Sequence, residues 1–471
     1  MSGFIPVLTF LIIFNLPLYA QHKPWSLQAC LDTGIRRNIQ LRQQQTGADI
    51  SRVELKQSID NLYPSVNITD APGYNFGKTQ TVNGSWVSLN TGSNAFAVSG
   101  SITLFDGFQL QNTIRESAYA YQSNLQTVEA DKNTISLNIL TAYMQVLASY
   151  EGLKIVLSQL AADSQQVEET RVYVTAGKYP VLNLLQVQST LANDRSAEKN
   201  AENQIILSKV NLMQLMNIPV DYTFDIVQPS GIDSILTITS LNSENIYNAA
   251  AGFLPQVKAA ELNSRASESA LEAAKALYYP KLVLNGSIRS SASSLNYTYT
   301  NFPATIGYLD GNPTLPVLGN YQEPGYSNTA SNLWNQFNDN FNQYAGLDLV
   351  IPLFSNFTAR NGVAIAKLNV HAARLNQEAV NIALRQAIEQ AYTGLLTSAE
   401  QYKASNEALI SEAATFGNMK NKYETGAGSA TDYLIEESNY TRAKQNVVQA
   451  KYNYLLQVKL IDFYLGKPLT F

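Results

Sequence analysis

Charged residues are scarce in this sequence. Asp, Glu, Lys and Arg make up 15% of its 471 residues, and the formal net charge is −5, whereas charged residues make up about a quarter of an average globular chain. A nucleic-acid partner requires a basic stripe that neutralises phosphates, and the sequence contains none. We therefore expect no nucleic acid among its partners.

Residues that carry chemistry are scarce as well. The chain has one cysteine, Cys30, and two histidines, His22 and His371. No internal disulfide can form, and Cys30 is expected to be a buried thiol on a helix. No nucleophile elbow, phosphate-binding glycine loop or metal-ligand cluster occurs. We predict that the protein is not an enzyme, that it has no cofactor and no metal site, and that any energy it uses comes from a partner.

Long apolar runs are confined to the amino terminus. Residues 1–20 are mostly apolar, are broken by Asn15 and Pro17, and end in the small residue Ala20. This pattern is typical of a secretory signal peptide, and a single membrane anchor is the alternative. After residue 20 no segment approaches the ~20 apolar residues of a membrane helix. If the mature chain crosses a membrane, it has to do so as a β-barrel.

The sequence contains two copies of one unit. The segments LFDGF at 104–108 and LFSNF at 353–357 are offset by 249 residues (353 − 104), and so are Gly177 and Gly426 (426 − 177). A repeat at a fixed offset is the mark of a duplicated structural unit. We predict a first repeat over 21–218, a linker over 219–242 and a second repeat over 243–471.

The second copy carries an insertion. The Tyr-Pro pairs that end at Pro64 and Pro280 are offset by only 216 residues (280 − 64), so 33 extra residues (249 − 216) follow the second pair. They fall at roughly 297–340, in a stretch rich in Pro, Gly, Asn and Tyr, and this composition predicts a long loop.

Each copy contains two stretches in which apolar and polar residues alternate. In the first copy these stretches lie at 64–70 and 95–104, and the second copy repeats the pattern. Strict alternation indicates strands with one apolar face. We predict two separate hairpins, at about 64–105 and at about 280–354. Four strands are too few to close a membrane barrel, which needs roughly eight, but three copies would supply twelve.

Long helices account for the rest of each copy. Residues 107–176 lack proline and place mainly apolar residues at every seventh position from Leu125 to Val174, which is typical of a coiled-coil seam. About 70 residues make a helix roughly 100 Å long. A return helix is predicted over 183–217 and an opening helix over 26–61. The second copy predicts the corresponding helices at 358–425, 431–465 and 243–278.

These features resemble the TolC-like outer membrane efflux protein family over essentially the whole mature chain. The resemblance is carried by the repeated Tyr-Pro ahead of a strand, the strand ends LFDGF and PLFSNF, the turn glycines, and the stretch 423–469, which begins YETGAGSATDYLIEES. It implies an α+β fold and a homotrimer. A twelve-stranded β-barrel, four strands from each protomer, would lie in the outer membrane of a Gram-negative cell and continue as a long α-helical coiled-coil tunnel into the periplasm.

The resemblance also implies a function. Family members are exit channels of tripartite efflux or type I secretion systems. They dock at their periplasmic tips on an adaptor (membrane fusion) protein, which links them to an inner-membrane pump of the RND or ABC type. Substrates leave through the lumen without chemistry. The chain lacks the near-terminal cysteine of lipid-anchored members, so we predict contact with outer membrane lipid but no acyl anchor.

A lumen constriction is the first candidate site that the resemblance implies. Asp432 matches a lumen-facing acid of the family, and three copies would form a carboxylate ring that selects cations. The alternative is an Asp that complements the helix dipole in the first turn, with Ser429 as N-cap. Tyr423 matches a gate-side tyrosine, and a partly buried coiled-coil aromatic is the alternative there.

Other positions near this turn depart from the family pattern. The second acid that the family often has is replaced by Ile435, and Glu436 and Glu437 follow directly, so Glu436 is our second candidate for the constriction. The family's basic residue is matched by Gly428. In the first copy Asn183 occupies the position of Asp432 (432 − 249), which would place the ring on one hairpin only.

The hairpin turns are the second candidate site. Gly177, Lys178, Gly426 and Gly428 would form the adaptor-docking tips. A glycine just past a helix end supplies the left-handed conformation that a tight turn requires. By analogy with the family, bulkier residues at these positions would block docking.

Two other functions fit part of the pattern. A passive nutrient porin would explain the strands but not two helical hairpins roughly 100 Å long. A periplasmic scaffold or adaptor would explain the helices but would leave four alternating strands without a role. Fractionation separates these alternatives, because only the scaffold should be soluble without detergent.

Overall fold

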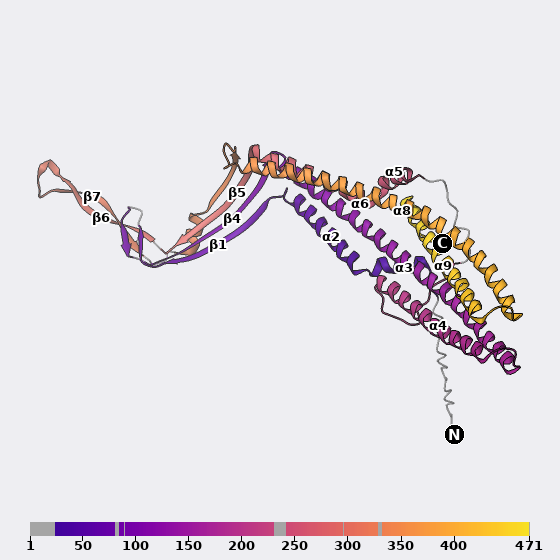
Figure 1. Ribbon diagram of the computed structural model, residues 1–471. Coiled ribbons are helices and arrows are strands. Elements are labelled where there is room, and N and C mark those ends of the chain that lie inside the picture. Colours follow the sequence, from indigo (N-terminus) through magenta and orange to yellow (C-terminus); the bar gives the residue numbers. More distant parts are fainter. Residues whose placement is uncertain are drawn as a thin grey trace, which may run out of the picture. The chain divides into compact units, whose positions relative to one another are not determined.

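The computed structural model describes residues 24–80, 84–88, 90–229, 242–294, 296–327 and 332–470. The signal peptide expected at 1–20, His22 and the larger part of the linker expected at 219–242 lie outside these ranges. The chain divides into two compact units (Figure 1). The helical unit comprises Met1–Ala48, Ser123–Glu261 and Asn376–Phe471, and the strand unit comprises Asp49–Gln122 and Leu262–Leu375.

Two pairs of long helices follow the sequence repeat. Helices α3 (Gln109–Thr175) and α8 (Thr358–Glu424) have 67 residues each, and the return helices α4 (Val181–Leu215) and α9 (Ala430–Tyr464) have 35 each. Both pairs keep the offset of 249 residues (358 − 109 and 430 − 181). The predicted internal repeat is therefore confirmed, and these helix ends lie within two residues of the predicted ones.

The opening helix of each copy is broken in two, which corrects the continuous helices expected at 26–61 and 243–278. The first copy has α1 (Leu27–Arg37) and α2 (Ile39–Asp60), and Asn38 between them is extended (ψ 121°). Its side-chain oxygen accepts from Leu41 N at 2.9 Å, so it acts as an N-cap for α2.

Proline causes the break in the second copy. Helices α5 (Ser243–Phe253) and α6 (Pro255–Lys275) meet at Leu254, whose ψ is 129°. The residue before a proline is forced out of the helical region, and proline is favoured at the first position of a helix. A 3₁₀ turn at Ala276–Tyr278 then leads to the next strand.

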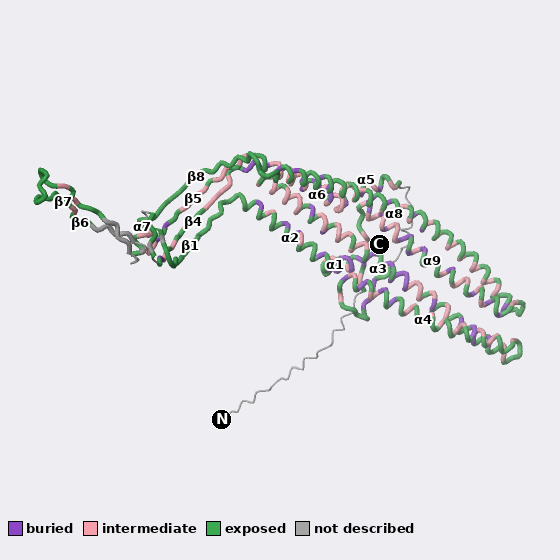
Figure 2. The backbone as a smooth tube through the Cα atoms, turned by 60° about the vertical axis from the view of Figure 1, so that its left-hand side comes forward, coloured by how far each residue is buried: buried purple, intermediate pink, exposed green. Residues whose placement is uncertain are grey.

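Four antiparallel strands form one sheet in the order β1-β4-β5-β8. The two hairpins, expected to be separate, are joined because β4 pairs with β5. Figure 2 shows β1 exposed along its whole length. The strands are β1 (Ser65–Asn75), β4 (Thr91–Phe105), β5 (Lys281–Ser293) and β8 (Asn342–Val350).

The strand register confirms the predicted apolar face. Ile68 lies opposite Val98, and Val98 lies opposite Ile288. Further along the same strands, Leu284 of β5 pairs with both Ile102 of β4 and Leu347 of β8. Cross-strand neighbours on one face pack against each other. Among the described residues, β1 and β8 pair along one edge only.

The insertion at 297–340 is not the irregular loop that its composition predicts. Strands β6 (Asn296–Tyr308) and β7 (Pro316–Ser327) form a second antiparallel hairpin, and helix α7 (Leu333–Asp339) follows. Tyr, Thr and Phe favour strands, and this preference outweighs the scattered prolines. Helix α7 contacts β5, since Gln336 Nε2 donates to Ser293 O at 2.9 Å. Two shorter strands, β2 (Lys78–Gln80) and β3 (Trp86–Ser88), extend the first hairpin.

The helical unit is held by two cores. One joins α1, α3 and α4, where Cys30, Ile139 and Leu212 expose no surface. The other joins α5, α8 and α9 around Ile246 and Ile388. Cys30 is a buried thiol on a helix, as predicted, and burial raises its pKa to about 12. None of the helices in the described ranges is both long and apolar enough to cross a bilayer.

Candidate functional site at the hairpin tips

Both long helices end in the same turn. Gly177 (φ 70°) and Gly426 (φ 78°) adopt the left-handed conformation. After α3, Lys178 N donates to Tyr173 O at 2.8 Å, and after α8, Ala427 N donates to Lys422 O at 2.8 Å. These bonds complete Schellman motifs, in which a glycine lets the chain reverse and satisfies the last carbonyls. The predicted conformational role of both glycines is therefore confirmed.

The tip residues differ in how much space surrounds them. A Cβ added at Gly177 or Gly426 would meet nothing within 4 Å, whereas at Gly428 it would lie 3.1 Å from Tyr423 N. Lys178 is exposed, and its ammonium lies 4.3 Å from the centre of the Tyr173 ring. The two open glycines thus offer a smooth backbone surface, while Gly428 is required by close packing.

Asp432 lies in the first turn of α9. Ser429 is the N-cap of this helix, as predicted, because its Oγ accepts from Asp432 N at 3.1 Å. The Asp432 carboxylate is exposed, and its charge complements the positive end of the helix dipole. Glu436 is one turn further on the same face and is partly buried. Both carboxylates are thus available at one surface of α9.

Tyr423 lies in an aromatic cluster that connects the two hairpin tips. The residue exposes 2% of its surface, and its ring stacks on Tyr433 at 5.0 Å between centroids. Tyr179, from the turn of the first copy, donates its hydroxyl to Tyr423 O at 2.8 Å. Phe416 packs against the same cluster. The ring of Tyr423 therefore packs inside the protomer, and its role at a gate stays a prediction.

Sequence reasoning missed an acidic cluster behind the tip. Asp163 of α3 and Glu437 of α9 are buried, and Asp194 of α4 is partly buried. Burial and then interaction with Asp163 raise the pKa of Asp194 to about 8, and the same two causes raise the pKa of Glu437 to about 7. Tyr433 donates to Glu437 Oε1 at 3.1 Å. These groups join α9 of the second copy to α3 and α4 of the first.

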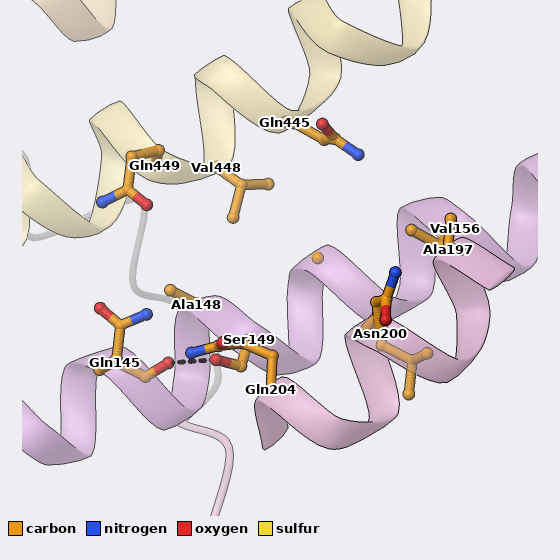
Figure 3. Close-up of a pocket in the computed structure, with 13 residues that line it drawn as sticks. Gln145, Ala148, Ser149, Val156, Ala197, Asn200, Gln204, Gln445, Val448 and Gln449 are labelled. Carbon is orange, nitrogen blue, oxygen red and sulfur yellow. Dashed lines mark hydrogen bonds between the residues drawn. The ribbon is translucent and has the colours of Figure 1, made fainter. Parts of the chain in front are cut away.

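A polar groove continues from this cluster along the same three helices. Figure 3 shows the adjoining cavity, of about 430 Å³, between α3, α4 and α9, with amide side chains from all three helices. Gln145, Asn200 and Gln445 line it, one from each helix. No group of three His, Cys, Asp or Glu side chains in the described ranges is arranged to hold a metal ion. The side chains that line this cavity are amides, one serine and small or apolar residues without charge.

A four-stranded sheet and two long helical hairpins in one chain are the features that the sequence analysis expects of an outer membrane channel. The model of the outer membrane efflux protein family matches residues 31–217 and 246–467. The chain belongs to this family, whose members are channels and not enzymes.

Relatives in several bacteria match most of the chain. Outer membrane protein TolC of Escherichia coli K12 is 22% identical over 444 residues, which cover 89% of this chain and 80% of TolC. Toxin and drug export protein A of Aggregatibacter actinomycetemcomitans is 20% identical over 392 residues, which cover 78% of this chain and 72% of that protein.

Solved structures show the same fold. The outer membrane channel CmeC of Campylobacter jejuni aligns with a TM-score of 0.71 and 16% identity over 93% of this chain and 85% of CmeC. VceC of Vibrio cholerae aligns with a TM-score of 0.71 and 15% identity over 94% of this chain and 96% of VceC. The protein is an outer-membrane exit channel for efflux, and channels of its family are trimers that work with adaptor and pump partners.

Proposed function

We propose that three copies of this chain close one duct, in which each copy supplies the strands β1, β4, β5 and β8 to a twelve-stranded barrel. The observation that supports this arrangement is the single four-stranded sheet with two outer strands, β1 and β8. In lipid the unpaired amides of an open edge cost several kcal/mol each. Pairing β1 of one copy with β8 of the next removes both edges.

The proposed duct receives its cargo from an adaptor and an inner-membrane pump of the RND or ABC type. The tips that would meet the adaptor are Gly177, Lys178, Gly426 and Gly428. What supports this assignment is the open space around the first and third of these, where a partner could approach the backbone closely. Relatives are named for the export of toxin and drug or of pyoverdine, so the family scaffold does not dictate one cargo.

Asp432 would form a carboxylate ring at the entrance of the duct. It is exposed in the single protomer and is fixed by the N-terminal turn of α9. Three carboxylates around a three-fold axis attract cations and repel anions. Glu436 would add a second layer, and Tyr423 would support the ring from behind, through its stack on Tyr433.

Single-channel recording in a planar bilayer tests the duct and the ring together. The wild type should show small, cation-selective openings, and Asp432→Asn should lower the preference for potassium over chloride by severalfold. The exposed acid Glu407 on α8 offers a matched control, so Glu407→Gln should leave the selectivity unchanged.

The outcomes separate the parts of the proposal. Unchanged selectivity in Asp432→Asn would keep the duct but remove Asp432 from its entrance. Large, weakly selective pores that need no helical hairpin would favour the porin. A protein that is soluble without detergent and forms no channels would leave only the periplasmic scaffold.

A further inference from the structure

Three carboxyl groups from three helices meet inside the helical unit. Asp163 of α3 and Glu437 of α9 expose 3% and 4% of their surface, and Asp194 of α4 is partly buried. All three carboxyls line one cavity, and Asp163 is close enough to raise the pKa values of both others. Ionised carboxylates only accept hydrogen bonds. The three groups can therefore bond to one another only if they share at least one proton.

The neighbouring donors do not satisfy the whole cluster. Tyr433 donates its hydroxyl to Glu437 Oε1 at 3.1 Å, and Gln159 donates Nε2 to Asp163 Oδ2 at 3.1 Å. Asp194 Oδ2 and Glu437 Oε2 are buried and have no hydrogen-bond partner among the described residues. A buried acceptor without a donor is costly, and a proton on an adjacent carboxyl is the donor that the geometry provides for.

The charges on the surrounding helices do not neutralise the cluster. Among the residues that line its cavity of about 400 Å³, Arg442 of α9 is the only cation, and it is exposed. From α8, the uncharged rings of Phe416 and Tyr423 pack on Tyr433, the donor to Glu437. Burial raises the pKa of Tyr433 far above neutrality, so this phenol stays a neutral donor. The acids alone can change charge here between pH 5 and pH 9.

We propose that Asp163, Asp194 and Glu437 form a proton-dependent latch between the two repeats. With shared protons the latch holds α9 of the second repeat against α3 and α4 of the first. When the protons are lost, like charges in a buried place repel one another, and α9 separates from the first repeat. The latch does not involve Asp432, and it controls opening of the duct rather than ion selectivity.

The other contacts between the repeats in this region are neutral. Thr441 of α9 donates to Gln159 Oε1 of α3 at 2.8 Å, and Tyr179 donates to Tyr423 O at 2.8 Å. Neither contact titrates near neutral pH. Because the pKa of Glu437 is raised to about 7 and that of Asp194 to about 8, the latch should hold below neutrality and release above pH 8.

Single-channel recording of the full-length protein between pH 6 and pH 9 tests the latch. The wild type should open at least about tenfold more often at pH 9 than at pH 6, since the opening equilibrium changes tenfold for each pH unit over which opening releases one proton. The double variant Asp194→Asn, Glu437→Gln cannot gain charge at these positions and should lose this pH dependence. Glu168→Gln removes an exposed acid of α3 and should keep it.

A second measurement follows the helices directly. Spin labels at Ala192 of α4 and Asn446 of α9, both exposed, report their separation when labelled protein is diluted with unlabelled protein before the trimers assemble. The distance should lengthen at pH 9 in the wild type and stay constant in the double variant.

Three results would overturn the latch. The first is an equal pH dependence in wild type and double variant. The second is loss of the response in Asp432→Asn, which would place the proton at the proposed ring. The third is a response that follows added calcium or a chelator at constant pH, which would make the acids a cation site. Failure of all channels to conduct, with the distance change intact, would count against the duct and not against the latch.

Discussion

At the residue scale, the turns at the hairpin tips depend on glycines with a positive φ. Gly426 follows α8 with φ 78°, while Gly417 lies inside α8, and a Cβ at either would meet nothing within 4 Å. Gly426→Ala should lower stability by about 1 kcal/mol because an L-residue is strained in this conformation. Gly417→Ala should raise it by about 0.5–1 kcal/mol. Thermal melts of the detergent-solubilised protein, followed by circular dichroism, measure both, and a common sign would contradict the explanation.

Two stacked tyrosines should respond differently to the loss of a hydroxyl. Tyr433→Phe removes the donor to Glu437 Oε1 and leaves a buried carboxyl without it, which should cost about 1–3 kcal/mol. Tyr423→Phe removes a buried hydroxyl with no partner among the described residues, so it should be neutral or slightly stabilising. Because the two rings are adjacent and of equal size, each variant controls for the other. A larger loss in Tyr423→Phe would show that its hydroxyl has a partner in the assembled trimer.

At the scale of the helices, the acidic cluster links stability to pH. The pKa values of Asp194 and Glu437 are raised in the folded protein, so the folded state binds more protons than the unfolded one. Their contribution is fully present below the unfolded pKa values near 4 and is lost as pH rises through about 7 and 8. The melting temperature should therefore fall between pH 6 and pH 9, by an amount equivalent to at most about 4 kcal/mol, and by less where solvent screens the partly exposed Asp194.

The double variant Asp194→Asn, Glu437→Gln is the control for this stability effect. Its melting temperature should change less over the same interval because amides do not titrate. Glu168→Gln, which breaks only an exposed ion pair with Arg171 at 3.7 Å, should behave like the wild type. A wild-type curve that is flat from pH 6 to pH 9 would mean that the cluster is already ionised at pH 6, because the folded and unfolded states would then bind equal numbers of protons.

The sequence predicts helices better than their interruptions. The ends of α3, α4, α8 and α9 follow from glycine turns and from uninterrupted apolar periodicity. The breaks at Asn38 and Leu254 are single-residue events that periodicity does not register, although Pro255 was a visible signal. Strands β6 and β7 are not predicted, because the prolines and asparagines of this segment indicate a loop and mask the strand preference of Tyr and Thr.

The acidic cluster was missed for a related reason. The apolar seam that passes through Val128, Ile135 and Ala142 continues at steps of seven to Val156, and Asp163 is the next member. A carboxylate on a seam is a sign of a buried charge that needs a partner. Its partners, however, come from α4 and α9, and their proximity depends on tertiary packing that one sequence does not reveal. The geometry of the tip turns could be predicted, whereas contacts between the repeats could not.

At the scale of the whole molecule, the two outer strands of the sheet predict which strands of neighbouring copies pair. With β1 of one copy beside β8 of the next, a cysteine at Thr69 should form an intermolecular disulfide with cysteines at some β8 positions. Only residues of one parity should react, because successive side chains point to opposite faces. The scan over Asn342–Val350 is best done in a Cys30→Ala background, so that the introduced cysteines are the only thiols. Non-reducing gels should show covalent dimers and trimers.

A cysteine pair inside the sheet supplies the control for this scan. Val98 of β4 and Ile288 of β5 face each other in the register of one chain, so a disulfide between them should leave the monomer's mass unchanged. Cross-links from Thr69 to β8 that stay within one chain would mean that the four strands curl on themselves. Cross-links with both parities would indicate random collision. Covalent trimers formed only through residues of one parity would show that β1 of one copy pairs with β8 of the next. The β8 position that reacts would give the strand register, and hence the shear of the barrel.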